Sequence, residues 1–173
     1  SVLSLPAFVR HNTTAPHGGA KVKFNTPHFT GSEGSVVFVF DVNGISKLYG
    51  TAYAAQLYAG LSPDDLRRVG TLSSFGTGTS GGTWIPQVIT LPHVAPGDDF
   101  YAQVRVWDRT KGESFEEARA VGGRHGRSVI ISLLGVTWDS PPPGPGLPGL
   151  SSFTLQPGLT TFDVGRLLFL SMQ

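Results

Sequence analysis

The chain has 173 residues, of which 39% are hydrophobic and only 14% are charged, and its net charge is +1. One domain of this size buries about 70% of its unfolded surface, and the near-neutral charge excludes the basic footprint of a nucleic-acid-binding protein. The absence of cysteine excludes disulfides and thiolate metal sites, and no apolar run reaches the ~20 residues of a membrane helix. The 23 glycines and 13 prolines separate short apolar runs, a pattern typical of an all-β protein.

Residues 1–18 are predicted to form an extension with one strand and a linker. The stretch SVLSLPAFVR alternates and places Leu3, Leu5, Ala7 and Val9 on one face. Asn12 opens the triplet Asn-Thr-Thr, which makes it a candidate site of glycan attachment. Because residue 1 is a serine with no charged region after it, we expect a processed or trimmed chain.

The next segments predict a strand and a hairpin. KVKF alternates at 21–24, and SVVFVFDV is a continuous apolar run at 35–42. The dipeptide Asn43-Gly44 favours a type I′ turn, so that ISKLYG becomes the return strand of a hairpin over 35–50. A further strand is predicted at 51–60.

The middle of the chain predicts one helical turn and two longer strands. Ser62, Pro63 and the two aspartates after them are helix-start signals, so a single helical turn is expected in 62–70. A glycine-rich loop follows, and then strands at 83–91 and 99–108. In the second of these strands, alternation predicts that Phe100, Ala102, Val104 and Val106 face the core.

The last third predicts one helix and three strands. Ser114 and Glu117 have the spacing of a capping box, and two glycines end the segment, so a short helix is expected near 114–121. A buried strand at 127–136 precedes a proline-rich spacer, and the remaining strands are predicted at 150–156 and in the closing stretch.

These elements predict an all-β fold in which two antiparallel sheets pack as a β-sandwich with one short helix. Jelly-roll connectivity is favoured over an immunoglobulin-like order. The predicted organisation is an N-terminal extension at 1–18, a sandwich domain at 19–139, a Pro/Gly linker at 140–149 and a C-terminal strand segment at 150–173.

Three stretches carry a family resemblance: FDVNGISKLYGTAYAAQLYAG at 40–60, VITLPHVAPGDDFYAQVRVWD at 88–108 and SFEEARAVGGRHGRSVIISLLG at 114–135. Together with GAKVKFNT and PPPGPGLPGLSSFTL, they resemble the recurring β-sandwich domain of secreted PEP-CTERM-type surface proteins of Verrucomicrobia and related bacteria. The resemblance covers about residues 19–156. It implies export to the cell surface or the extracellular matrix, with no enzymatic role to carry over.

The end of the chain departs from the family's sorting tail. Gly158 stands where the Glu of Pro-Glu-Pro is expected, Asp163 and Arg166 interrupt the apolar run, and no basic cluster follows. The uninterrupted part has the length of one strand, far short of the ~30 Å hydrocarbon core of a membrane. We therefore expect this segment to be buried in protein and the chain to have no membrane span.

No pattern in the sequence indicates catalysis, a metal or a cofactor. The five histidines form no close pair, and DVNG at 41–44 lacks the later ligands of a calcium loop. The carboxylates lie mostly at caps or turns, and GTGTSGG lacks the lysine of a phosphate-binding loop. We therefore expect that the protein is not an enzyme, although a glycosidase pair among the carboxylates stays a third hypothesis.

The leading prediction is a structural subunit of an extracellular bacterial filament, built head-to-tail by donation of a terminal strand to a neighbouring sandwich. Its partners are then copies of itself. The C-terminal segment is favoured as donor and the N-terminal one is second; the predicted subunit contacts are Phe162, Val164, Leu168, Leu170, Met172, Leu3, Leu5 and Val9.

The alternative is a monomeric carbohydrate-binding or cell-surface matrix module. Tyr101 and Trp107 fall on one face of a predicted strand and are the candidate sugar-stacking residues, with a polysaccharide as the partner. Cross-strand aromatic packing is the structural explanation for the same two residues.

Overall fold

A computed structural model describes residues 19–26, 36–133 and 146–159. This part of the chain consists mostly of β-strands with one short α-helix, which confirms the all-β prediction. Its strands are β1 Ala20–Phe24, β2 Val39–Phe40, β3 Tyr53–Gly60, β4 Arg67–Ser74, β5 Gln87–Leu91, β6 Phe100–Asp108, β7 His125–Arg127, β8 Ile131–Leu133 and β9 Phe153–Thr154. The helix α1 spans Phe115–Ala120, and three 3₁₀ turns lie at Gly50–Ala52, Gly78–Ser80 and Arg109–Lys111. No helix in these ranges is both long and apolar enough to cross a membrane.

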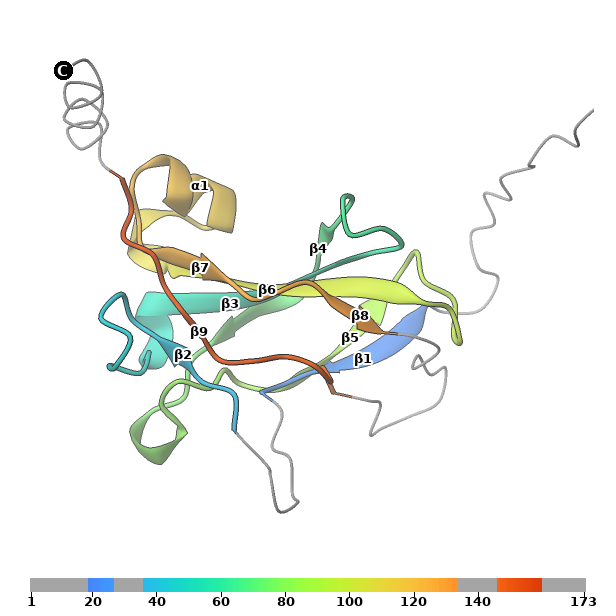
Figure 1. Ribbon diagram of the computed structural model, residues 1–173, viewed down its shortest axis with the longest axis horizontal. Helices are drawn as coiled ribbons and strands as arrows, with labels where there is room; N and C mark the ends of the chain where they lie inside the picture. The colour runs from blue at the N-terminus through green and yellow to red at the C-terminus, as the bar shows by residue number, and fades with distance from the viewer. Residues whose placement is uncertain (1–18, 27–35, 134–145, 160–173) are drawn as a thin grey trace, which may run out of the picture.

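The strands form one larger sheet and two strand pairs. The five-stranded sheet has the order β4-β3-β6-β7, and β8 also pairs with β6. β1 pairs with β5 in antiparallel orientation, whereas β2 and β9 form a parallel pair. In Figure 1, β1 and β5 lie on one side of β3 and β6, and α1 lies on the other side.

The main core lies on the face of the large sheet that is turned toward β1 and β5. Phe100, Ala102, Val104 and Val106 of β6 are at most 1% exposed, so the predicted core face of this strand is confirmed. They belong to one cluster with buried side chains of β1, β2, β3 and β5, such as Phe24. The period-2 alternation therefore identified the core side of β6 correctly.

A second, smaller core lies under α1 on the opposite face of the same sheet. It consists of Ala54, Tyr58, Trp107, Phe115 and Ala118. The Ser114 hydroxyl accepts a hydrogen bond from the Glu117 N–H at 3.2 Å, which confirms the predicted helix start. The Glu117 carboxylate accepts from the Glu113 N–H rather than from Ser114 itself. The centre of the large sheet is thus buried on both faces.

The helical turn expected in 62–70 is wrong. The Asp65 N–H donates to the Ser62 carbonyl at 3.2 Å, which closes a tight turn, and β4 begins at Arg67. Serine followed by proline and aspartate suits a β-turn as well as a helix start. β4 went unrecognised because much of it is exposed, so it lacks the alternation that marks a half-buried strand.

The hairpin predicted over 35–50 is shorter than expected. β2 has two residues, and Phe40 bridges to Lys47 across the loop. The Gly44 N–H donates to the Asp41 carbonyl at 2.8 Å, and Gly44 alone in this turn has a positive φ, 68°. A type I′ turn needs positive φ at two residues, so the turn is of another type.

The continuous strand predicted at 127–136 is divided in two within the described residues. β7 ends at Arg127 and β8 begins at Ile131, and both pair with β6 along different stretches. Between them, the Ser128 N–H donates to the Val104 carbonyl at 2.9 Å, and its hydroxyl accepts from the Val104 N–H at 3.0 Å. Similarly, the strand predicted at 83–91 begins only at Gln87.

Residues 146–156 include the end of the predicted linker at 140–149 and the beginning of the predicted C-terminal segment at 150–173. Leu147, Leu150 and Leu155 are at most 5% exposed and belong to the main core. β9 pairs with β2, and Gln156 bridges to His125 of β7. Residues 146–156 are therefore part of the same folded unit, because their leucines complete its core.

Candidate functional site

One edge of the large sheet is unprotected among the described residues. β8 pairs with β6 along one edge, and no described strand pairs with its other edge. The stretch Ser128–Leu133 contains no charge and no proline, and Val129 and Ile130 are 58% and 42% exposed. Natural edge strands usually carry lysine, proline or a bulge that discourages further pairing. The edge of β8, defined here by residues 129–133, is therefore suited to accept another strand.

β1 also has a strand partner on one edge only within the described ranges, but its composition is different. Lys21 and Lys23 alternate with its three buried residues, Ala20, Val22 and Phe24. Charged side chains on an edge strand oppose the approach of another strand. By this criterion the edge of β8 is better suited than the edge of β1 to accept another strand.

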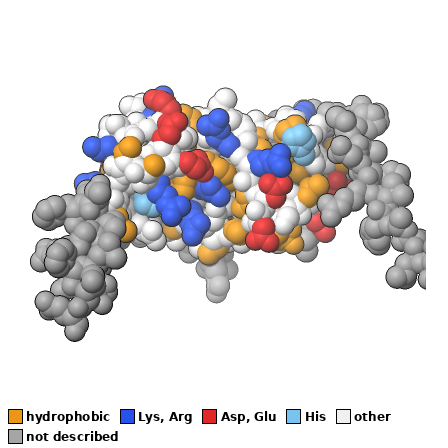
Figure 2. All heavy atoms as spheres, turned by 90° about the horizontal axis from the view of Figure 1, so that it is seen from above, with side chains coloured by type: hydrophobic (Ala, Val, Ile, Leu, Met, Phe, Trp, Pro, Cys, Tyr) orange, Lys and Arg blue, Asp and Glu red, His pale blue; other side chains and the backbone are white. Residues whose placement is uncertain are grey.

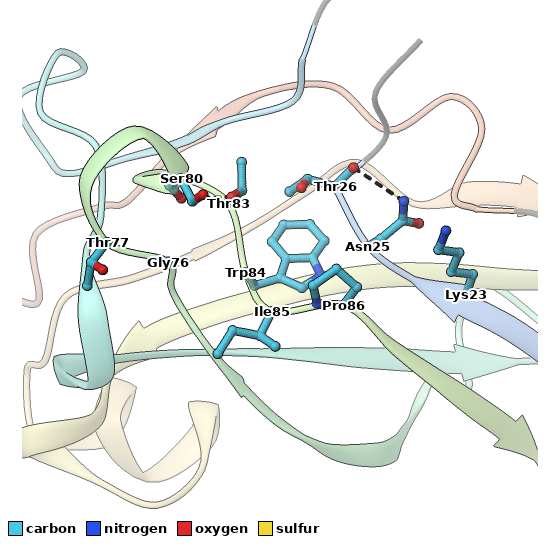
Figure 3. Close-up of a pocket in the computed structure, with 10 residues that line it drawn as sticks. All are labelled: Lys23, Asn25, Thr26, Gly76, Thr77, Ser80, Thr83, Trp84, Ile85 and Pro86. Atoms are coloured by element: carbon cyan, nitrogen blue, oxygen red, sulfur yellow. Dashed lines mark hydrogen bonds between the residues drawn. The ribbon is translucent and has the colours of Figure 1, made fainter. Parts of the chain in front are cut away.

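A polar pocket of about 490 Å³ lies between the end of β1 and the loop that joins β4 to β5. Figure 3 shows the Trp84 indole in the middle of the lining residues, with Asn25 and Lys23 on one side and Ser80 and Thr83 on the other. Trp84 stacks on Phe24, with ring centroids 5.0 Å apart. The Gly76 N–H donates to the Thr83 carbonyl at 2.8 Å, which fixes the loop that carries Trp84.

Two buried polar atoms of the pocket residues have no hydrogen-bond partner among the described residues. They are the Nε1 donor of Trp84 and the Oδ1 acceptor of Asn25. The Asn25 amide nitrogen donates to the Thr26 carbonyl at 3.4 Å. An unpaired buried donor or acceptor costs about 1–3 kcal/mol. Because both atoms have almost no accessible surface, they are enclosed in the pocket wall.

A polar network holds α1 on the outer face of the large sheet, the face seen in Figure 2, where basic and acidic side chains lie close together. The Arg105 guanidinium lies 3.9 Å from the centre of the Tyr58 ring. Its Nε donates to the Gln103 Oε1 at 3.0 Å, and its Nη1 pairs with the Glu116 carboxylate at 2.8 Å. The Tyr58 hydroxyl donates to the same carboxylate at 2.9 Å. β3, β6 and α1 are thereby tied together.

The same network raises the pKa of Tyr58 to about 12. Burial of the phenol is the main cause, and the hydrogen bond to the nearby negative charge of Glu116 adds to it, while Arg105 and Arg68 act in the opposite direction. The phenol therefore stays protonated and donates to Glu116 throughout the physiological range. Since its partners are already satisfied, this network has a structural role.

The two candidate sugar-stacking residues do not form a shared platform. Trp107 is 0% exposed under α1, and its Nε1 donates to the Gly112 carbonyl at 3.0 Å. Tyr101 lies half-buried at the other end of β6, about 20 Å away along the strand at 3.3 Å per residue. The stacking role predicted for Trp107 is therefore wrong in this fold, because the helix α1 covers the ring.

The other predicted site residues lie outside the described ranges. These are the candidate glycan-attachment residue Asn12 and the predicted subunit contacts Leu3, Leu5, Val9, Phe162, Val164, Leu168, Leu170 and Met172. Within the described ranges, no group of three His, Cys, Asp or Glu residues could hold a metal ion. In the DVNG turn, Asp41 pairs with Arg124 at 2.7 Å, and the Asn43 side chain accepts two backbone N–H groups.

The chain matches no protein-family model, no curated protein and no solved structure. The resemblance to surface-protein domains therefore stays a prediction.

Sequence reasoning missed the pocket and the β8 edge. The sequence predicts only a glycine-rich loop around Gly76, whereas in the structure this stretch follows β4 and carries Trp84 into the pocket wall. The run Val129–Leu133 lies within the buried strand that the sequence predicts at 127–136. Its lack of any charge was the available signal for an edge that can pair.

Proposed function

We propose that this protein is a structural subunit of an extracellular filament or matrix, assembled head-to-tail by addition of a terminal strand to the β8 edge of a neighbouring copy. The observation that carries the proposal is this edge, which has no described strand partner, no charge and two exposed apolar residues, Val129 and Ile130. Strand addition supplies a row of main-chain hydrogen bonds to such an edge. Head-to-tail addition that does not close on itself produces a filament.

The proposed fold of the subunit is a two-layer β-sandwich of jelly-roll type. Two pairings support it: β3 and β4 form a hairpin, and after β5 the chain returns as β6 to pair with the other edge of β3. The link between β4 and β5 is the Phe75–Trp84 bridge, together with the hydrogen bond from the Ile85 N–H to the Ser74 carbonyl at 2.9 Å. The core between the two layers is continuous.

The proposed donor is the C-terminal segment, whose sequence alternates from Phe162 to Met172. Burial of each large apolar side chain in the acceptor contributes about 1.5–3 kcal/mol before the ordering cost. Leu159, the last described residue, is 62% exposed and lies at the surface. The N-terminal strand with Leu3 and Leu5 is the second candidate donor. Export to the cell surface is proposed from the sequence resemblance alone.

The first test is a pair of variants examined by electron microscopy and size-exclusion chromatography. Replacing Leu168 and Leu170 by Asp removes the donor, and replacing Val129 and Ile130 by Lys blocks the acceptor edge. Each variant should be a folded monomer where the unmodified protein forms filaments. Ile45→Lys is the matched control, because Ile45 is 81% exposed in the loop after β2, a strand that does not pair with β8; it should assemble normally.

A mixture of the two variants separates head-to-tail addition from other modes of association. The donor variant keeps an intact β8 edge, and the acceptor variant keeps an intact C-terminal strand. Together they should form a one-to-one complex that grows no further. If no such complex forms, or if both variants still polymerise, strand addition at β8 is wrong. If only the Leu168/Leu170 variant still polymerises, the donor test moves to Leu3 and Leu5.

The alternative, a monomeric carbohydrate-binding or matrix module, is favoured by one observation, the polar pocket beside Trp84. It predicts that the unmodified protein stays monomeric at all concentrations. A monomer that binds a sugar would support this alternative against the filament.

A further inference from the structure

We infer that Asn43 is a site of deamidation through a cyclic imide, and that the turn at 41–46 controls the rate of this modification. The chain has three asparagines, and Asn43 is the one followed by glycine, whereas Asn12 and Asn25 are each followed by threonine. Because glycine has no side chain, its backbone nitrogen can approach the preceding carboxamide without hindrance. No described atom lies within 4 Å of the position of a Cβ on Gly44, so the surroundings of the turn are also open.

The reaction requires only this segment and water. The Gly44 nitrogen loses its proton and forms a bond to the Asn43 Cγ, and the carboxamide nitrogen takes up a proton and leaves as ammonia. Water then opens the imide ring. Cleavage of the new bond leaves aspartate, and cleavage of the original peptide bond leaves isoaspartate, whose main chain is longer by one methylene. Residues 42–46 are exposed, so water has access to every atom that reacts.

The folded turn holds both reacting groups in hydrogen bonds. The Gly44 N–H donates to the Asp41 carbonyl at 2.8 Å, so the proton that must leave is engaged. The Asn43 Oδ1 accepts from the N–H groups of Ile45 and Ser46 at 3.0 and 2.8 Å, and the Asn43 Nδ2 donates to the Ser46 hydroxyl at 2.8 Å. These bonds hold the carboxamide against residues 45 and 46. Ring closure must break them, because the Cγ has to bond to the Gly44 nitrogen instead.

The turn is itself anchored to the rest of the fold. The Asp41 N–H donates to the Ser46 carbonyl at 2.7 Å, which closes the turn at its base. The Asp41 carboxylate accepts from the Val42 N–H at 2.8 Å and pairs with Arg124 at 2.7 Å. Arg124 also donates to the Tyr53 hydroxyl at 3.1 Å, which connects the turn to β3. The free energy of local opening of this turn therefore sets the rate at which Asn43 can react.

The test compares the full chain folded in buffer with the same chain unfolded in urea, at one pH and temperature. Trypsin releases residues 24–47 as one peptide that contains both Asn25 and Asn43, and fragmentation in a mass spectrometer locates the deamidation and separates aspartate from isoaspartate. In urea, Asn43 should react faster than Asn25. In the folded protein, Asn43 should react at least about tenfold more slowly than in urea, because opening breaks four hydrogen bonds, each worth a factor of about two to ten.

Two matched variants test the role of the turn. Ser46→Ala removes the acceptor of the Asn43 Nδ2, so it should speed the reaction of the folded protein about two- to tenfold and leave the rate in urea unchanged. Ser62→Ala is its control, because the Ser62 hydroxyl accepts from the Asp64 N–H at 3.3 Å in a different turn. This change should not alter the rate at Asn43. Circular dichroism verifies the fold of each variant.

The proposal is overturned if Asn43 reacts no faster than Asn25 in urea, or if Asn43 reacts at the same rate in the folded and the unfolded chain. It is equally overturned if Ser46→Ala and Ser62→Ala have the same effect, or if Ser46→Ala speeds the reaction in urea as well. The turn follows β2, which does not pair with β8. Deamidation rates and filament assembly are therefore separate measurements, and failure of this inference differs from failure of the proposed function.

Discussion

At the residue scale, Arg105 shows why a polar side chain in the middle of β6 is stable on a nearly buried face. Its flat guanidinium stacks on Tyr58, and two of its nitrogens donate to Gln103 and Glu116. Lysine has the same charge but neither the planar group nor the second directed donor. The contact therefore depends on the shape of arginine as well as on its charge.

Arg105→Lys should lower the free energy of unfolding by about 1–2 kcal/mol, since it leaves the Gln103 oxygen unpaired and removes the stacking on Tyr58. Urea unfolding followed by tryptophan fluorescence measures this loss. Arg109→Lys is the control, because the Arg109–Glu113 pair is exposed and 3.5 Å long; its effect should stay below about 0.5 kcal/mol. Equal effects of the two changes would contradict the role assigned to Arg105.

The raised pKa of Tyr58 predicts a loss of stability in alkali. The phenol has a pKa of about 12 in the folded protein against 10.0 when unperturbed, so below pH 10 its proton is bound in both states and the contribution is fully present. As the pH rises from 10 toward 12, the unfolded chain loses the proton first, and the free energy of unfolding falls, by on the order of 2 kcal/mol in total.

Tyr58→Phe should remove this part of the pH dependence. The measurement is urea unfolding of both proteins at several pH values from about 9 to 11. Other groups titrate in the same range, but they are common to both proteins, so the difference reports Tyr58. Tyr101→Phe, which removes the hydroxyl of a tyrosine on β6, is the comparison. If the free energy of unfolding of Tyr58→Phe changes with pH in parallel with that of the unmodified protein, the Tyr58 phenol is not involved.

At the scale of elements, the way β4 lies beside β5 depends on one glycine. Gly70 has a φ of +69°, and a Cβ atom there would lie 2.6 Å from the Ile89 Cδ1. Side chains connect the same two strands, because Gln87 of β5 donates to the Thr71 carbonyl and the Ser73 hydroxyl of β4. The strands approach closely where Gly70 has no side chain, so Ile89 can fill the core.

Gly70→Ala should therefore destabilise the protein more than a glycine substitution in an open turn. Gly44 is the matched control: its φ is +68°, and no atom lies within 4 Å of the position of a Cβ. Both changes carry the cost of a left-handed alanine, about 1–2 kcal/mol. Gly70→Ala should add about 1–3 kcal/mol for overpacking against Ile89. Thermal unfolding of the two variants measures the difference. Equal midpoints would mean that Ile89 and β5 shift to accommodate the methyl group with no loss of stability.

At the scale of the whole molecule, the segment 146–156 closes the core that the earlier strands leave open. Leu147 is 0% exposed, and Leu150 and Leu155 are nearly so. The position of a Cβ on Gly146 lies 3.0 Å from the Asn25 Oδ1, and that on Gly149 lies 3.8 Å from Ile131, so the segment passes from the end of β1 to β8. The last part of the proline-rich stretch is thus a structural element.

Two truncations should separate this role from that of the segment after it. A chain that ends at residue 145 loses three buried leucines, each worth about 1.5–3 kcal/mol, which together rival the whole stability of a domain. It should not unfold cooperatively in urea. A chain that ends at residue 159 keeps every described residue and should remain folded, while it should no longer form filaments. Cooperative unfolding of the shorter chain at an unchanged midpoint would contradict the role of residues 146–156.

The sequence by itself determined the elements whose signals are local. The alternation in 99–108 identified the buried face of β6, and the Ser114–Glu117 spacing predicted α1, because period and capping depend on neighbouring residues only. β4 was missed for the converse reason: an exposed strand has no alternation, and its pairing with β3 is decided by distant residues.

Only the tertiary structure decided which side chains are accessible and which segments meet. Trp107 has the sequence signature of an exposed aromatic, yet the packing of α1 buries it. Asn25 and Trp84 are far apart in the chain and come together because β1 pairs with β5 and the preceding loop folds back beside it. Similarly, β7 and β8 pair with successive stretches of β6, and no described strand pairs with the outer edge of β8. The burial of a side chain and its distance from other side chains depend on contacts between residues that are distant in the sequence. The pattern of neighbouring residues does not determine those contacts.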